Sequence, residues 1–207
     1  MATPQPRRGD TRRRIQDVAM DLFAQQGYEK TSLREIAEHL DVTKAALYYH
    51  FKTKEDILAS IAEDLTKPVD EVIAWAESQP RSLATKQEML RRYSEALWAA
   101  APLFRFVQEN QATMRELSIG EYFRSKVTAL SGLLKEDGAP LTAQVRSVTA
   151  LSAMHWGVFA MQNVEGDPEE KRAAILEVAL DLLAEAEAAA EAASQTTGGA
   201  GPGAHGA

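Results

Sequence analysis

Apolar residues recur at helical spacing along most of this 207-residue chain, and no segment alternates between apolar and polar residues as a β-strand does. Alanine, leucine and glutamate, which favour helices, are abundant, whereas runs of β-branched residues are scarce. The chain is long enough to bury a substantial hydrophobic core in one or two domains. The sequence therefore predicts an all-α fold.

The composition excludes several classes of chemistry. The chain contains no cysteine, so disulfides, thiol catalysis and cysteine-ligated zinc sites are excluded, and an intracellular location fits. The arginine-rich start has no apolar segment behind it, so we expect no secretory signal. The longest apolar run, "ALWAAAPLF" at 96–104, is too short to span a bilayer. We therefore expect a cytoplasmic protein.

The formal net charge of −7 hides an uneven distribution of charge. Residues 1–67 carry 11 basic and 11 acidic residues, whereas residues 68–207 carry 12 and 19. Within the first part, residues 1–14 hold five arginines and one aspartate, and residues 42–54 hold three lysines and no acid. Positive charge is thus concentrated where a polyanion could bind, and the acidity of the rest argues only against indiscriminate binding to nucleic acid.

The first part of the chain carries start and stop signals for four helices. The first is expected over 11–26 and ends before Gly27, a residue that adopts a left-handed conformation at little cost. Ser32 and Glu35 form a capping box at the start of the second helix, and Thr43 caps a short third helix. A fourth begins near residue 54. The sequence therefore predicts a unit of three helices followed by a connecting helix.

The remainder also shows helical periodicity interrupted by helix breakers. Pro68 predicts either the junction with the next helix or a kink. The Gly- and Ala-rich segment at the C-terminus has no means of packing, and we expect it to be disordered. Helices are expected at about 68–78, 83–100, 102–116, 119–136, 142–164 and 168–193.

The second and third predicted helices form a helix-turn-helix. In this motif the second helix enters the major groove of DNA, and the first crosses the backbone. Leu47 is predicted to point inward and Phe51 to pack against the first helix, so the other positions of the third helix are free to face outward. Caps place helix N-termini near phosphates, where backbone amides favour an anion. A solvated, purely structural helix would not explain why capping residues, lysines and aromatic residues converge on one side of one short helix.

The segment "TSLREIAEHLDVTKAALYYHFKTKEDIL", preceded by "AMDLFAQQGYEK", resembles the DNA-binding signature of TetR-type transcriptional regulators. The resemblance covers about 48 residues, and chain length and the helical remainder extend it to the whole architecture. It implies an N-terminal helix-turn-helix domain and a larger C-terminal helical domain for ligand binding and dimerisation. Two positions depart from the family, because Asp41 and Ala45 stand where it often has glycine. Asp tolerates a left-handed backbone, so the turn is expected to survive, whereas Ala45 is expected to change base preference.

The resemblance assigns DNA-contact and phosphate-contact positions. The phosphate contacts fall on the caps Thr31, Ser32 and Thr43. The arginines of residues 7–14 could reach a minor groove or the backbone, or they form a solvated basic tail. The DNA-contact positions are Arg34, Lys44, Ala45, Ala46, Tyr48, Tyr49, His50 and Lys54. Because Ala45 and Ala46 are too short to hydrogen-bond a base, discrimination should depend on Lys44, Tyr49 and Arg34, with methyl contacts to thymine.

The resemblance also implies a homodimer that pairs the last two long helices of each chain. Small residues recur on one stripe of the helix over 142–164, where two helices could approach closely, and the last helix is apolar on more than one face. The expected interface residues are Ala150, Ala153, Gly157, Ala160, Val164, Val178 and Leu182. The expected domain boundaries are 1–10 for a flexible basic arm, 11–66 for DNA binding, 67–193 for ligand binding and dimerisation, and 194–207 for a disordered tail.

Aromatic and methionine residues of the middle helices are candidates for a ligand pocket. Ligand sites are mostly apolar with a few placed polar groups, but an ordinary helical core has the same composition, and for any single residue the core interpretation is favoured. The expected ligand is a small apolar or aromatic molecule. The pocket candidates are Trp98, Phe104, Phe106, Met114, Tyr122, Phe123, His155, Trp156 and Phe159.

No catalytic constellation, metal-spaced cluster or phosphate-binding glycine loop is found, so we expect neither an enzyme nor a cofactor. The function that fits best is a regulator, in the first instance a repressor, that binds a palindromic operator as a homodimer and is released by a small-molecule inducer. Two alternatives stay open. The chain could be a helical interaction protein without a small-molecule ligand, or a transcriptional activator on the same fold.

Overall fold

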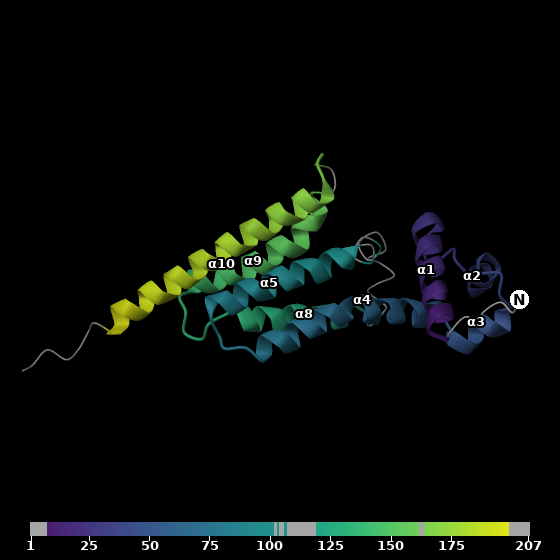
Figure 1. Cartoon of the computed structure of the whole chain (residues 1–207), viewed down its shortest axis with the longest axis horizontal. Coiled ribbons are helices and arrows are strands. Elements are labelled where there is room, and N and C mark those ends of the chain that lie inside the picture. Colours follow the sequence, from purple (N-terminus) through teal and green to yellow (C-terminus); the bar gives the residue numbers. More distant parts are fainter. Residues whose placement is uncertain (1–7, 102, 104–105, 107–118, 162–163, 199–207) are drawn as a thin grey trace, which may run out of the picture. The chain divides into compact units, whose positions relative to one another are not determined.

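A computed structural model describes residues 8–101, 103, 106, 119–161 and 164–198 of the chain (Figure 1). These residues form α-helices and no β-strand, which confirms the predicted all-α fold. The helices are α1 (Arg8–Gln26), α2 (Leu33–His39), α3 (Lys44–His50), α4 (Lys54–Glu77), α5 (Leu83–Ala99), α8 (Ile119–Leu134), α9 (Leu141–Ala160) and α10 (Pro168–Gly198). Most of the helix expected over 102–116 lies outside the described residues.

The chain divides into two compact units. The first unit contains residues 1–67 and 102–122, and the second contains residues 68–101 and 123–207. The division falls inside α4, which continues through Pro68 to Glu77 without ending. Of the two alternatives predicted at Pro68, a helix junction or a kink, the junction is therefore wrong. A proline inside a helix removes one backbone hydrogen bond, and here the helix continues past that loss.

The first unit packs α1, α2 and α3 around a common core. α2 contacts both α1 and α3. Ile15, Phe23, Ile36, Leu47 and Ile57 are all fully buried. Because these residues come from α1, α2, α3 and the start of α4, one core holds all four segments in place.

Phe106 is a member of this first unit. It is buried, and its ring stacks on that of Phe23 with 5.7 Å between centroids. The ring of Tyr28 meets Phe106 edge-on, with centroids 6.2 Å apart. Phe106 was expected to line a ligand pocket, and the structure places it instead in an aromatic cluster of the helix-turn-helix unit.

The second unit is a helical bundle in which α9 and α10 lie side by side and α5 packs against both (Figure 1). Its buried residues include Met89, Leu130, Leu134, Leu151 and Leu183. α10 continues to Gly198, past its expected end at residue 193. Alanines dominate the packing near its C-terminal part, where Ala143 of α9 lies against Ala186 and Ala190.

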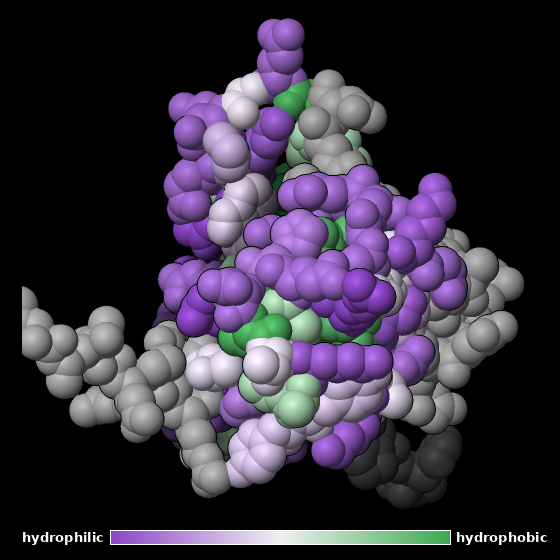
Figure 2. Space-filling view, turned by 90° about the vertical axis from the view of Figure 1, so that its right-hand side faces the viewer, coloured by the Kyte–Doolittle hydropathy of each residue, from purple (hydrophilic) through white to green (hydrophobic). Residues whose placement is uncertain are grey.

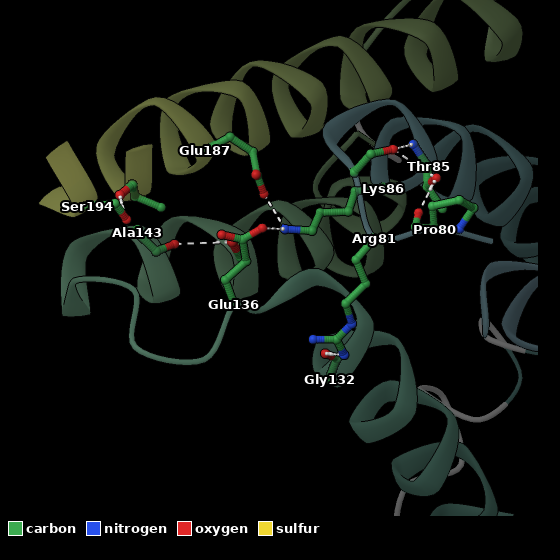
Figure 3. Close-up of polar contacts among 12 residues, drawn as sticks. Pro80, Arg81, Thr85, Lys86, Gly132, Glu136, Ala143, Glu187 and Ser194 are labelled. Carbon is green, nitrogen blue, oxygen red and sulfur yellow. Dashed lines mark hydrogen bonds and ion pairs between the residues drawn. The ribbon is translucent and has the colours of Figure 1, made fainter. Parts of the chain in front are cut away.

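A buried ionic network joins three segments of this unit (Figure 3). Lys86 of α5 is only 3% exposed. Its Nζ atom donates to Oε1 of Glu136, at 2.9 Å, and to Oε1 of Glu187 on α10. Glu136 follows the end of α8, so a single lysine ties α5, the α8–α9 connection and α10 together.

No helix among the described residues is both long and apolar enough to cross a membrane.

Candidate nucleic-acid interface

Local sequence signals fix the start of α2. Ser32 caps the helix by accepting a hydrogen bond from the backbone N of Glu35, at 3.2 Å. The Glu35 carboxylate in turn accepts from the backbone N of Ser32, at 2.7 Å. This confirms the predicted capping box. The hydrogen bonds from Ser32 also hold the pKa of Glu35 below its usual range, so the box stays charged.

The turn between α2 and α3 depends on Asp41. Its φ angle is +52°, in the left-handed region, as expected for an aspartate that replaces glycine. Backbone hydrogen bonds from Asp41 N to Glu38 O, at 3.2 Å, and from Val42 N to Ala37 O, at 3.1 Å, close the turn. Thr43 then caps α3 by accepting from Ala46 N at 3.2 Å. The turn thus fixes the direction in which α3 leaves α2.

The α3 helix has one buried side and one exposed side. Leu47 is fully buried and Phe51, just after the helix, is 2% exposed, as predicted. Lys44, Ala45 and Ala46 are exposed. Tyr49 is 62% exposed, whereas Tyr48 and His50 are partly buried. Two apolar anchors therefore hold the helix, and its first turn together with Tyr49 faces outward.

Cations and aromatic rings are combined on this exposed side. Lys44 Nζ lies 5.3 Å from the ring centroid of Tyr48. Lys52 Nζ donates to the carbonyl oxygen of Tyr48 at 2.6 Å, a favourable place for a cation because it is the C-terminal end of a helix. Tyr49 and His50 meet edge-on at 5.3 Å. Figure 2, which is turned so that α2 and α3 face the viewer, shows mostly hydrophilic side chains over these helices.

Three predicted contact residues have partners within the chain. Thr31 is buried, and its hydroxyl donates to the carbonyl oxygen of Gly27 at 2.9 Å, so its assignment as a phosphate contact does not fit the structure. Arg34 is exposed but pairs with Glu38 at 2.7 Å, which offsets its charge. Lys54 turns toward the residues that follow α1. Ser32 and Thr43 are exposed, where a phosphate could reach them.

Tyr28 is a structural residue of this unit that the sequence interpretation missed. It directly follows Gly27, whose φ of +92° ends α1, and its side chain is buried. Its hydroxyl donates to Glu55 Oε1 at 3.0 Å. The signal available in the sequence was an aromatic residue immediately after a helix-ending glycine, a position where apolar contacts often close a helix end.

A groove of about 640 Å³ also lies in the first unit, between α1 and α4. Arg12 and Arg13 line one part, and Asp17, Asp21 and Asp64 line another. Its wall includes Gln16, which donates to Ser60 Oγ and Asp64 Oδ2, both at 2.6 Å. None of the α3 residues that face outward lines this groove.

The residues expected to form a ligand pocket are only partly described by the structure. Phe104 and Met114 lie outside the described residues, as do the side chains of Tyr122 and Phe159. Trp98 and Phe123 are partly buried in the second unit. Trp156 is 65% exposed, which does not fit a residue lining an enclosed pocket.

His155 of α9 forms a polar pair with Tyr93 of α5. The Tyr93 hydroxyl and His155 Nε2 are hydrogen-bonded, and the two rings meet edge-on at 5.5 Å. Burial lowers the pKa of His155 to about 4 and raises the pKa of Tyr93 well above its usual value. Both groups are therefore neutral near pH 7, and this pair is the polar feature that remains from the predicted pocket.

The predicted interface stripe is divided between buried and exposed residues. Ala150 is fully buried within the chain, and a Cβ atom at Gly157 would lie 2.9 Å from side-chain atoms of Ile175 on α10. Packing within one chain thus explains why these two residues are small. Ala153 and Leu182 are partly buried, whereas Ala160, Val164 and Val178 are exposed.

Comparison with known proteins shows that part of the first unit is similar to a family of regulators. Residues 15–61 match the family described as bacterial regulatory proteins, tetR family. The HTH-type transcriptional regulator AcrR of Shigella flexneri is 52% identical over 54 residues, which are 26% of this chain and 25% of AcrR. The negative transcriptional regulator IcaR of the biofilm operon icaADBC in Staphylococcus epidermidis is 39% identical over 51 residues, 25% of this chain and 28% of IcaR. The matched region thus spans about a quarter of the length of these curated relatives.

Similarity to solved structures extends over most of the chain. The crystal structure of AmtR from Mycobacterium smegmatis aligns with a TM-score of 0.56 and 25% sequence identity, covering 92% of this chain and 98% of AmtR. The similarity therefore includes helices of both units. Among the described residues, no group of three or more His, Cys, Asp or Glu side chains could hold a metal ion.

Proposed function

We propose, on the premise that the first unit of this chain belongs to the tetR family of bacterial regulatory proteins, that the chain is a DNA-binding transcriptional regulator rather than an enzyme. The observation that carries the proposal is the exposed side of α3, held by buried Leu47 and Phe51. A helix fixed in this way can enter a major groove and bring its first residues to base edges. The expected place of action is the cytoplasm.

Base recognition is proposed for the exposed residues of α3. Lys44 can donate to the acceptors of guanine, and Tyr49 is likewise exposed on α3. Ala45 and Ala46 offer methyl groups to thymine. Ser32 and Thr43, at the starts of α2 and α3, are proposed to meet phosphates, which position the protein without reading sequence.

A homodimer is proposed from the exposed apolar surface of α9 and α10. Leu141, Val145, Trp156 and Val178 are all large apolar residues that are more than half exposed in the single chain. Contiguous apolar residues at a surface are typical of association sites. A two-fold dimer would present two copies of α3 about 34–36 Å apart, the spacing of successive major grooves on a palindromic operator.

Release by a small apolar or aromatic ligand is proposed as the regulatory step. The neutral Tyr93–His155 pair lies among apolar residues of α5 and α9, where it could orient such a ligand. A ligand that binds one arrangement of the dimer more tightly shifts the population toward it, and by linkage DNA then lowers the affinity for the ligand. Repression is favoured over activation because IcaR, similar in the first unit, is named a negative regulator.

Selection of DNA by the full-length protein tests the proposal. The immobilised protein is incubated with a random-sequence duplex library, and retained duplexes are sequenced over successive rounds. We expect a two-fold-symmetric consensus, bound with an affinity that falls steeply as salt rises. Enrichment of no sequence, with a folded protein, would refute a sequence-specific regulator and favour the alternative of a helical interaction protein.

A further inference from the structure

Lys54, the first residue of α4, has its ammonium group turned away from the exposed side of α3. Its Nζ atom donates to the carbonyl oxygen of Tyr28 at 2.7 Å and lies 3.5 Å from that of Glu29. The same atom lies 4.4 Å from the centroid of the Tyr28 ring. An ammonium group has three donors, and these contacts direct it toward the turn between α1 and α2.

The neighbouring residue of α4 holds Tyr28 from another side. Glu55 accepts a hydrogen bond from the Tyr28 hydroxyl at 3.0 Å. Its pKa is held below its usual range, by a hydrogen bond from its own backbone amide and then by the Tyr28 hydroxyl, so this acceptor is a carboxylate. The Tyr28 ring also packs on Phe23, with centroids 5.0 Å apart. Lys54 and Glu55, two consecutive residues of α4, thus both contact the buried Tyr28 of the α1–α2 turn.

The contacts of Lys54 and Glu55 with Tyr28 lie close in sequence to α3. Residues 51–53 alone separate the end of α3 from the start of α4. Within that link, the backbone N atoms of Lys52 and Thr53 both donate to Asp56 Oδ2 at 3.0 Å, which fixes the link to α4. The position of α4 relative to the α1–α2 turn therefore determines where the C-terminal end of α3 is held.

We propose that Lys54 is a positioning residue that fixes α3 through Tyr28, and that it does not contact a DNA phosphate. The proposal rests on the proposed DNA-binding function, and it reverses the role that the sequence resemblance implies for this position. A phosphate would have to compete with a charge-assisted hydrogen bond and with an aromatic ring for the ammonium group, and both interactions favour the observed position.

The salt dependence of DNA binding separates the two roles. The probe is the duplex that the wild-type protein selects from the random-sequence library. The plot of log affinity against log salt has a negative slope, and losing one phosphate contact makes that slope less steep by about 0.9. We expect Lys54→Met to weaken binding about 10- to 150-fold at every salt concentration without changing this slope, as for the loss of a charged hydrogen bond. Lys44→Gln is the matched variant. It removes an exposed cation that the proposed docking brings into the groove between the phosphates, so it should make this slope less steep.

Two results would overturn the proposal. A slope made less steep to the same extent in Lys54→Met and Lys44→Gln would make Lys54 a phosphate contact. Unchanged affinity in a folded Lys54→Met protein, checked by circular dichroism well below its melting temperature, would leave the residue a role in stability alone. Failure of the wild-type protein to select any duplex would instead refute the proposed function, and it would be seen before any variant is made.

Labelling of the wild-type protein covers the case in which the variant does not fold. Lysine amines are acetylated with a limiting reagent, with and without the selected duplex, and quantified by mass spectrometry. Lys54 should react slowly in the free protein and equally slowly with DNA, whereas Lys44 should react quickly and be protected by DNA. Rapid labelling of Lys54 in the free protein that DNA suppresses would contradict the positioning role.

Discussion

Tyr49 is the most exposed large apolar residue of α3, and it is also proposed to contact DNA bases. Its side chain is 62% exposed on a helix that two buried residues hold, so little of the core depends on it. We expect Tyr49→Ala to change the free energy of unfolding by less than about 0.5 kcal/mol. The same substitution should weaken binding to the selected duplex by about 1–3 kcal/mol, measured by fluorescence anisotropy, because a contact at a base edge is lost. Undiminished affinity would remove Tyr49 from the proposed interface.

Two helical glycines differ in what a side chain would meet. A Cβ atom at Gly157 would lie 2.9–3.0 Å from three side-chain atoms of Ile175, whereas at Gly132 of α8 nothing lies within 4 Å. Replacing a helical glycine by alanine favours the helix by about 1 kcal/mol. We therefore expect Gly132→Ala to stabilise the protein by about 0.5–1 kcal/mol. Gly157→Val, which adds branched bulk against Ile175, should destabilise it by about 1–3 kcal/mol because α9 and α10 must shift. Urea unfolding measures both, and equal effects would contradict the close α9–α10 contact.

At the scale of elements, the buried lysine of the second unit holds three segments together. Lys86→Met would leave Glu187, whose side chain is 11% exposed, without its cation. Breaking a buried ion pair at one partner costs about 3–5 kcal/mol, whereas replacing both partners by apolar residues is often close to neutral. We expect Lys86→Met to destabilise the protein by that amount and Lys86→Met/Glu187→Leu to recover most of it in chemical denaturation. A double variant as unstable as the single one would show that lost packing, rather than the unpaired charge of Glu187, causes the loss of stability.

The same network should contribute to the pH dependence of stability. The hydrogen bond from Lys86 holds the pKa of Glu136 below its usual 4.5. Because this pKa is lower in the folded state, Glu136 stabilises the fold above pH 4.5 and loses that effect as pH falls through the folded pKa. The melting temperature of the wild-type protein should thus fall more steeply from about pH 5 to about pH 3 than that of Lys86→Met. Glu35, Glu55 and Glu169, whose pKa values are also lowered, are unchanged in the variant. Parallel curves would therefore contradict the contribution of Glu136.

The elements best predicted from sequence were those with local causes. The capping box of Ser32, the left-handed Asp41 and the inward Leu47 depend on a few adjacent residues, and the structure agrees with the sequence at all three. α4 continues through Pro68, and the proline alone could not decide between the predicted helix junction and the predicted kink. Thr31 was assigned to a phosphate by the resemblance, but its side chain is buried. Its hydroxyl meets a carbonyl group of the preceding turn, a contact that spacing along a single helix does not reveal.

In the second unit, the sequence left open which partner each small or aromatic residue contacts. Ala150 and Gly157 were expected between two chains because small residues permit close approach, but α10 of the same chain lies against α9. Composition identifies residues that permit close packing and leaves open which helix uses them. Likewise, nothing in the sequence distinguished Phe106, which packs on Phe23, from the aromatic residues of a ligand pocket.

At the scale of the whole molecule, the apolar surface of α9 and α10 is the feature that a single chain leaves unexplained. Trp156 of α9 and Val178 of α10 are 65% and 54% exposed. We expect Trp156→Glu and Val178→Glu each to shift the protein from dimer to monomer in sedimentation velocity, because a carboxylate would lose its water in an apolar interface. Secondary structure should be retained, since neither side chain is buried within the chain.

The same two variants connect assembly to DNA binding. A dimer binds two half-sites at once, so the second contact forms at a high effective concentration. Loss of the dimer should weaken binding to the selected two-fold site by about 100-fold or more, with a smaller effect on an isolated half-site. Thr128→Glu, which adds the same charge at an exposed position of α8, is the matched control and should leave both assembly and DNA binding unchanged. A monomeric variant with wild-type affinity for the full site would separate DNA binding from dimerisation, and the exposed apolar surface would then need a different partner.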